Sequence, residues 1–146
     1  MTAEESSYAF IAQVPVRWSD MDAFGHINHA RMVTLMEEAR IQWLLSAGEK
    51  YAPLIKSAMI VHVEIRYQAQ LRHDDSPLSI AMWITGHRNV DFTIGYEIRR
   101  ASAGYDTKPA CVASTQMAVV DLEAHTLRRM TVAEKGYLAE LGRIGE

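Results

Sequence analysis

The sequence predicts an α+β domain in which one antiparallel β-sheet wraps around a long central α-helix. Three observations lead to this prediction: an alternating stretch precedes a long helical one, four more alternating stretches follow it, and the helical stretch is apolar on most of its circumference. Strands that follow one another through short turns pair antiparallel. A helix that is apolar on nearly every side needs cover on more than one side, so we expect the sheet to curl around it.

The first strand and the helix are predicted from the spacing of their apolar residues. Residues 8–18 alternate, with apolar side chains up to Trp18 on one face, and Pro15 favours a sheet edge because it cannot donate a ladder hydrogen bond. The helix is expected over residues 29–47, with Asn28 as its N-cap and Gly48 as its stop. We expect this helix to be deeply buried.

Four further strands and a closing helix are expected after the central helix. Turn residues at 74–77 separate the first of these strands from the next. Thr131 and Glu134 have the spacing of a capping box, which predicts a short helix to about Leu141. The expected strands cover residues 59–72, 78–85, 90–100 and 110–122, with a short extension into Leu127.

Length and composition restrict the class of protein. A chain of 146 residues has the size of one domain, expected here over residues 1–146. The net charge of −3 gives no basic field for nucleic acid, and no apolar run approaches the roughly 18 residues that a membrane span needs. One cysteine, Cys111, and an N-terminus without a signal-peptide layout favour the cytoplasm. The open edges of the expected sheet favour homodimers.

Residues 19–29 hold the richest group of polar side chains, just before the central helix. Free backbone N–H groups at a helix N-terminus can stabilise a developing oxyanion, and Asp22 and His26 supply a carboxylate and an imidazole beside them. These features suit attack on a carbonyl. Asp, Gly and Asn are also ordinary turn and cap residues, so a purely structural loop remains an equal alternative.

The polar residues of this segment can also be compared with two known kinds of metal site, a calcium-binding loop and a transition-metal site. The spacing from Asp20 opens like a calcium-binding loop, but Phe24 and Arg31 stand where oxygen ligands are needed. His26 and His29 resemble half of a transition-metal site, without the cysteine or zinc-protease pattern that would support one. We therefore expect no metal.

The run VRWSDMDAFGHINHAR at residues 16–31, followed by EEAR at residues 37–40, resembles the hotdog-fold acyl-CoA thioesterases of the 4-hydroxybenzoyl-CoA thioesterase type. It is also similar to the matching segment of acyl-acyl-carrier-protein thioesterases. The resemblance extends over nearly the whole chain in element order and is sharpest in the first third. It implies a hotdog fold, with the helix inside a curled sheet, and an activity that needs no cofactor.

The resemblance also implies a role for each residue of the motif. Asp22 matches the catalytic carboxylate, and the backbone N–H of His29 matches the group that polarises the thioester carbonyl. His26 and Asn28 match active-site residues of the carrier-protein enzymes, and Glu38 matches their helix glutamate. Relatives often carry Asn or an aromatic residue at the position of His29, so the acyl preference is not carried over.

The expected function is hydrolysis of an acyl-CoA to a free carboxylic acid and CoA, in a homodimer or homotetramer with its cleft between subunits. Hydrolysis of a carrier-protein thioester, a lyase reaction on enoyl or hydroxyacyl thioesters, and acyl-CoA binding without turnover are the alternatives. The hydratase motif of such lyases is not found in the sequence.

Several further residues have two interpretations. Glu38 is equally a base that reaches the dimer cleft or an ordinary surface residue. For Glu37, a solvated position or an ion pair with Arg31 or Arg40 is favoured over a catalytic role. Asp20 is expected to fix the loop, and Cys111 to be buried and inert. The candidates for contact with CoA phosphates are Arg66, Arg72, Arg88 and Arg99, although solvated strand faces explain them as well.

Overall fold

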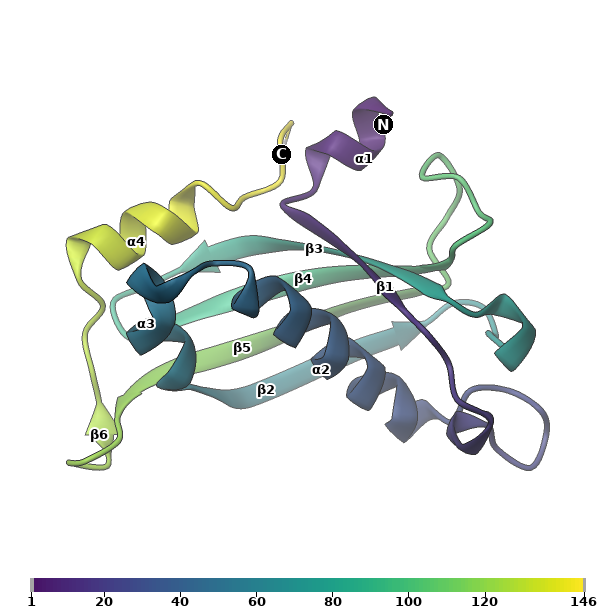
Figure 1. The fold of residues 1–146 in the computed structure, drawn as a ribbon, viewed down its shortest axis with the longest axis horizontal. Coiled ribbons are helices and arrows are strands. Elements are labelled where there is room, and N and C mark those ends of the chain that lie inside the picture. Colours follow the sequence, from purple (N-terminus) through teal and green to yellow (C-terminus); the bar gives the residue numbers. More distant parts are fainter. Residues whose placement is uncertain (1, 146) are drawn as a thin grey trace.

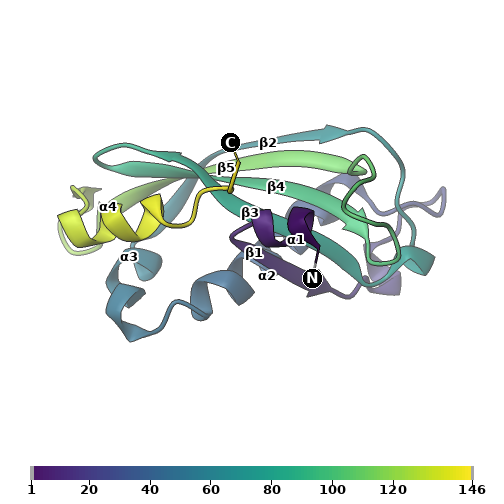
Figure 2. The same ribbon diagram turned by 90° about the horizontal axis from the view of Figure 1, so that it is seen from above.

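The computed structural model describes residues 2–145 and shows a curled antiparallel sheet with one long helix across its concave face (Figures 1 and 2). The sheet has the strand order β1-β3-β4-β5-β2, and a short β6 pairs with β5. This arrangement confirms the predicted α+β class. The helices and strands are α1 (Ala3–Ser7), β1 (Phe10–Val14), α2 (His29–Leu45), α3 (Ala52–Lys56), β2 (Ala58–Tyr67), β3 (Leu78–His87), β4 (Asp91–Arg100), β5 (Cys111–Asp121), β6 (Thr126–Leu127) and α4 (Val132–Ala139).

The order of strands differs from the expectation at one place. β3, β4 and β5 pair in sequence as predicted, but β2 pairs with β5 and not with β3. After Tyr67 the chain leaves the sheet and crosses its end, where the N–H groups of Gln68 and Ala69 bond to the carbonyl of Ala110. β2 and β1 therefore form the two edges of the main sheet. The edge position of β1 agrees with Pro15, which follows its last residue.

Strand β1 is shorter than its alternating sequence suggests. Ala12, Val14 and Val16 are buried, but Trp18 is 79% exposed. The expectation that Trp18 continues the apolar face of this strand is wrong, because the strand ends at Val14 and a 3₁₀ turn begins at Trp18. This turn redirects the chain toward the start of α2.

Helix α2 begins and is capped as predicted but is buried on one side only. The Asn28 side chain accepts a hydrogen bond from the Ala30 N–H, at 2.8 Å. The helix packs mainly against β1 and β3, and Ala30, Ile41 and Leu45 are exposed. The expectation of burial all around is therefore wrong for a single chain, because the curled sheet leaves one side of the helix without cover (Figure 2).

The edge strand β2 exposes apolar side chains and contains an irregularity. Its register against β5 shifts between Ile60 and His62, so Val61 has no partner on β5. A bulge of this kind breaks the simple alternation that residues 59–72 suggest. Most of β2 is exposed, including Met59 and Val63.

The closing segment packs back onto the sheet. Thr131 and Glu134 form the predicted capping box at the start of α4. Leu138 is buried, and the carbonyl of Leu141 accepts a hydrogen bond from the Ile84 N–H at the end of β3. Among the described residues, no helix is long and apolar enough to cross a membrane.

Candidate active site

The loop between β1 and α2 is anchored by the carboxylate of Asp20, which is fully buried. Asp20 accepts hydrogen bonds from the backbone N–H of Arg17 at 2.8 Å and from its guanidinium at 3.1 Å. Burial alone would raise the pKa of Asp20, but the hydrogen bonds and charge of Arg17 outweigh it and lower the pKa. The Asp20 carbonyl also accepts from the Asn28 N–H. These contacts confirm that Asp20 fixes the loop.

Asp22 lies two residues later and closes a tight turn. Its Oδ1 accepts hydrogen bonds from the N–H of Phe24 at 2.8 Å and from the N–H of His26 at 3.1 Å. Its own N–H donates to the His26 carbonyl at 2.7 Å. Gly25 makes this turn possible with a φ of 79°, a conformation that glycine adopts without strain.

The surroundings of Asp22 favour its ionised form. The backbone hydrogen bond from His26 has the largest effect and lowers the pKa of the carboxyl. The hydrogen bond from Phe24 and the charges of His26 and His29 lower it further, whereas partial burial raises it. The two backbone hydrogen bonds hold the carboxyl group in place, and because Asp22 is only half-buried the group remains accessible. A fixed, ionised carboxylate can act as a nucleophile or accept a proton from water.

The N-terminus of α2, which follows this loop directly, presents free donors. The Asn28 side chain uses its oxygen to cap the Ala30 N–H. The N–H groups of His29 and Arg31 have no acceptor among residues 2–145. Together with the positive end of the helix dipole, they can bind an oxyanion.

The structure adds two residues that the sequence motif does not contain. The Tyr67 hydroxyl, at the end of β2, donates to the His29 carbonyl at 2.6 Å. Arg72 Nη2 lies 3.5 Å from His26 Nε2. Tyr67 ends β2, and Arg72 lies in the segment that follows it. The Ile27 N–H also donates to the Leu71 carbonyl of that segment. The sequence offers no local signal for Tyr67 or Arg72, because more than 35 residues separate each from its contact.

The structure brings most of the predicted site residues together, and Glu38 is the exception. Asp22, His26, Asn28 and His29 lie within one loop and the first turn of α2, whereas Glu38 is more than two turns further along the helix. Glu38 is half-buried and forms no hydrogen bond or ion pair within the described chain.

The neighbouring Glu37 has an ordinary structural role. Its carboxylate lies 3.5 Å from Arg40 Nη2, which confirms one of the two expected ion pairs. Arg40 is itself buried and donates through Nη1 to the Tyr96 hydroxyl at 3.2 Å. That hydroxyl is 2.7 Å from the Thr115 side chain. The three groups form a polar connection from α2 into the sheet.

Three of the four arginines considered for phosphate contacts already have carboxylate partners. Arg66 lies near Glu64, Arg88 pairs with Asp91, and the buried Arg99 pairs with Glu97. In residues 2–145, no three His, Cys, Asp or Glu side chains are grouped so that they could hold a metal ion.

A family model described as the thioesterase-like superfamily matches residues 16–138. No curated protein matches the sequence at a significant level. Among solved structures, a thioesterase from Thermus thermophilus complexed with coenzyme A and Zn superposes with a TM-score of 0.77 at 15% identity, covering 92% of this chain and 95% of its own. A 1,4-dihydroxy-2-naphthoyl-CoA thioesterase from Synechocystis gives a TM-score of 0.70 at 20% identity, with coverages of 90% and 95%.

Proposed function

Since the chain belongs to the thioesterase-like superfamily, we propose that it hydrolyses acyl-CoA thioesters to a free carboxylic acid and CoA. The hotdog fold, a curled sheet around a helix, agrees with this family. Family membership supports thioester hydrolysis in general, and CoA as the thiol carrier is the more specific part of the proposal. It draws on two of the similar structures, which are described as a complex with coenzyme A and as a naphthoyl-CoA thioesterase.

One observation carries the proposal: the carboxylate of Asp22 is held ionised by backbone hydrogen bonds in the loop that leads directly to the free N–H groups at the start of α2, where His29 acts on its charge. In the proposed complex the thioester carbonyl lies with its carbon toward Asp22 and its oxygen toward the N–H of His29. As the carbon becomes tetrahedral, negative charge develops on the oxygen, and the N–H group and helix dipole stabilise it. Structural turn residues alone would not need this juxtaposition.

Two routes complete the reaction with the same residues. Asp22 either attacks the carbonyl carbon and forms an anhydride that water then hydrolyses, or it takes a proton from a water molecule that attacks in its place. In both routes the carbon–sulfur bond breaks and the thiolate leaves, to be protonated as free CoA. His26 and Asn28 position the turn and the helix N-terminus, since both bond through their backbone to the loop.

The proposed cleft is completed by a second copy of the chain. β2 is an unpaired edge strand, and its apolar side chains and those on the open side of α2 have no cover in one chain. Such an edge is a ready template for pairing with another strand. We propose a homodimer that pairs two β2 edges, with the tetramer as a further assembly of dimers.

The first experiment compares thiol release from short, medium, long and aromatic acyl-CoAs by the parent and by Asp22→Asn. We expect release from part of this panel and a fall of at least about 100-fold in kcat for the variant, because an amide neither attacks nor accepts the proton. The amide oxygen can still accept the two backbone hydrogen bonds, so the loop should keep its shape.

The matched control is Asp74→Asn, which changes an exposed carboxylate in the turn before β3 and should leave the rate unchanged. Cys111 does not disturb the assay, because it is buried and burial raises the pKa of its thiol to about 11. An Asp22→Asn variant as active as the parent would exclude the proposed mechanism. A chain that binds acyl-CoA without releasing thiol would instead be a binding protein.

A further inference from the structure

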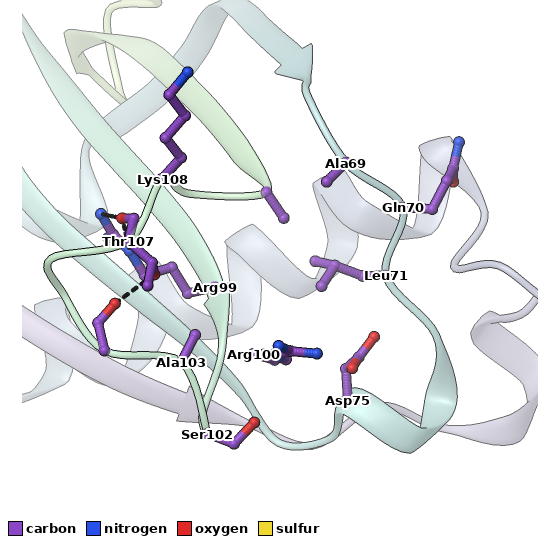
Figure 3. Close-up of a pocket in the computed structure, with 12 residues that line it drawn as sticks. Ala69, Gln70, Leu71, Asp75, Arg99, Arg100, Ser102, Ala103, Thr107 and Lys108 are labelled. Carbon is purple, nitrogen blue, oxygen red and sulfur yellow. Dashed lines mark hydrogen bonds between the residues drawn. The ribbon is translucent and has the colours of Figure 1, made fainter.

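A pocket with three cationic side chains in its lining lies beside the segment that follows β2 (Figure 3). It has a volume of about 510 Å³ and lies between residues 69–75, which follow β2, and the loop that joins β4 to β5. This volume is within the range of small-molecule sites. Arg99, Arg100 and Lys108 contribute three cations to the lining, and Asp75 contributes its one carboxylate.

Two of these three cations are available to a ligand. The guanidinium of Arg99 is buried and already bound, since it donates to the Thr107 carbonyl at 2.9 Å and pairs with Glu97 at 2.9 Å. Arg99 therefore holds the β4–β5 loop in place. Arg100 and Lys108 are exposed, and neither side chain forms a hydrogen bond or ion pair with any residue in the described range 2–145. Figure 3 shows Arg100 beside Leu71 and Asp75, with Lys108 at another rim of the pocket.

The pocket and the candidate active site share one wall. Leu71 lines the pocket, and its carbonyl accepts the hydrogen bond from the Ile27 N–H at 2.8 Å. The next residue, Arg72, lies with its Nη2 3.5 Å from His26 Nε2, in the loop before α2. The segment that includes Leu71 therefore connects the pocket with the loop before α2.

We infer that Arg100 and Lys108 bind the nucleotide phosphates of the CoA portion of the substrate; the inference rests on the proposed function. An acyl-CoA carries its reacting carbonyl at one end of a flexible arm and its phosphates at the other. Free cations bind phosphates through charge-assisted hydrogen bonds, Arg in a bidentate manner and Lys as a point charge. The chain as a whole has a net charge of −3, so the positive charge at this pocket is a local feature and not part of a generally basic surface.

The test is the double variant Arg100→Ala/Lys108→Ala, assayed with two substrates that share an acyl group. One substrate is the acyl-CoA, and the other is the same acyl group on pantetheine, which has no phosphate. We expect KM for the acyl-CoA to rise roughly tenfold, with kcat nearly unchanged, because two partly solvated charge contacts are lost. KM for the acyl-pantetheine should stay the same.

The matched control is Arg129→Ala, which removes an exposed cation between β6 and α4, at the far end of the sheet from the pocket (Figure 1). It should leave both KM values unchanged. An unchanged KM for acyl-CoA in the double variant, or an equal rise for both substrates, would overturn the phosphate site. A loss seen only with a carrier-protein thioester would assign the pocket to that protein and would also overturn it.

A binding measurement separates this inference from the proposed function. Titration calorimetry with CoA alone should show weaker binding to the double variant than to the parent and the Arg129→Ala control. If the parent releases no thiol from any substrate, hydrolysis is excluded, and the calorimetric difference still decides whether the pocket holds phosphates. Equal affinities for CoA would exclude the site even in an active enzyme.

Discussion

At the scale of single residues, the proposed chemistry depends on the ionisation of Asp22. Two backbone N–H groups and the charges of two nearby histidines lower its pKa, although partial burial acts in the opposite direction. The carboxylate therefore exists at neutral pH without any neighbouring cationic side chain bonded to it. Its partners are backbone groups, which cannot change rotamer, so the orientation of the carboxylate follows from the fold of the turn.

This lowered pKa predicts the pH dependence of hydrolysis. In the proposed mechanism Asp22 acts in its deprotonated form, so its lowered pKa is expected to move the acid limb of kcat/KM below about pH 4, the usual range of an Asp side chain. The rate should fall only as the pH drops through the lowered pKa. The measurement is kcat/KM for one acyl-CoA from about pH 3 to about pH 7, with circular dichroism as a check on folding. An acid limb centred near about pH 6.5 would assign the limiting proton to an imidazole instead.

At the scale of elements, the loop from β1 to α2 is held by an ion pair whose carboxylate is buried. Asp20 has no exposed side-chain surface, while its partner Arg17 is about half exposed. The pair lies in the 3₁₀ turn that replaces the end of the predicted first strand. The anchor places Asp22 and the start of α2 in fixed relation, because the Asp20 carbonyl also receives the Asn28 N–H.

We predict that Asp20→Asn lowers the free energy of unfolding by about 1–3 kcal/mol, since charged hydrogen bonds to Arg17 are lost from a buried site. The pKa of Asp20 is lowered in the folded state, so its contribution is present above about pH 4 and is lost as the pH falls through the lowered value. Urea unfolding at about pH 7 and about pH 3 measures both effects. Ser19→Ala, next to it but exposed, is the control. Equal stability of Asp20→Asn and the parent at neutral pH would contradict the anchoring role.

Elements with local signals could be predicted from the sequence, and those that depend on distant pairing could not. The Asn28 cap, the Thr131–Glu134 box and the β3–β4 hairpin each depend on neighbouring residues. The pairing of β2 with β5, and the bulge near Val61, depend on a register that only the folded sheet defines. The same distinction holds in the site, where the motif contained Asp22 but not Tyr67, which reaches α2 from another strand.

At the scale of the whole molecule, one chain leaves its own helix half covered. α2 packs against β1 and β3 on one side, and Leu45 on the other is 75% exposed. The edge strand β2 exposes apolar side chains along its length. The apolar sequence pattern of α2 led to the expectation that the helix is buried on every side. A second copy of the chain is the simplest way to cover the apolar side chains that one chain leaves exposed.

We predict that Val61→Lys converts the dimer to a monomer and abolishes most thiol release. Val61 is 57% exposed at the free edge and has no partner on β5, so a lysine there does not disturb the core but places charge where a second β2 would pair. The control is Val132→Lys, on the first turn of α4, where the side chain is 89% exposed and away from both sheet edges. Light scattering coupled to size-exclusion chromatography gives the mass of each variant. A parent that is monomeric and fully active would refute the shared cleft, whereas a monomeric Val61→Lys that still melts cooperatively and has lost activity would support a site completed by the partner's edge.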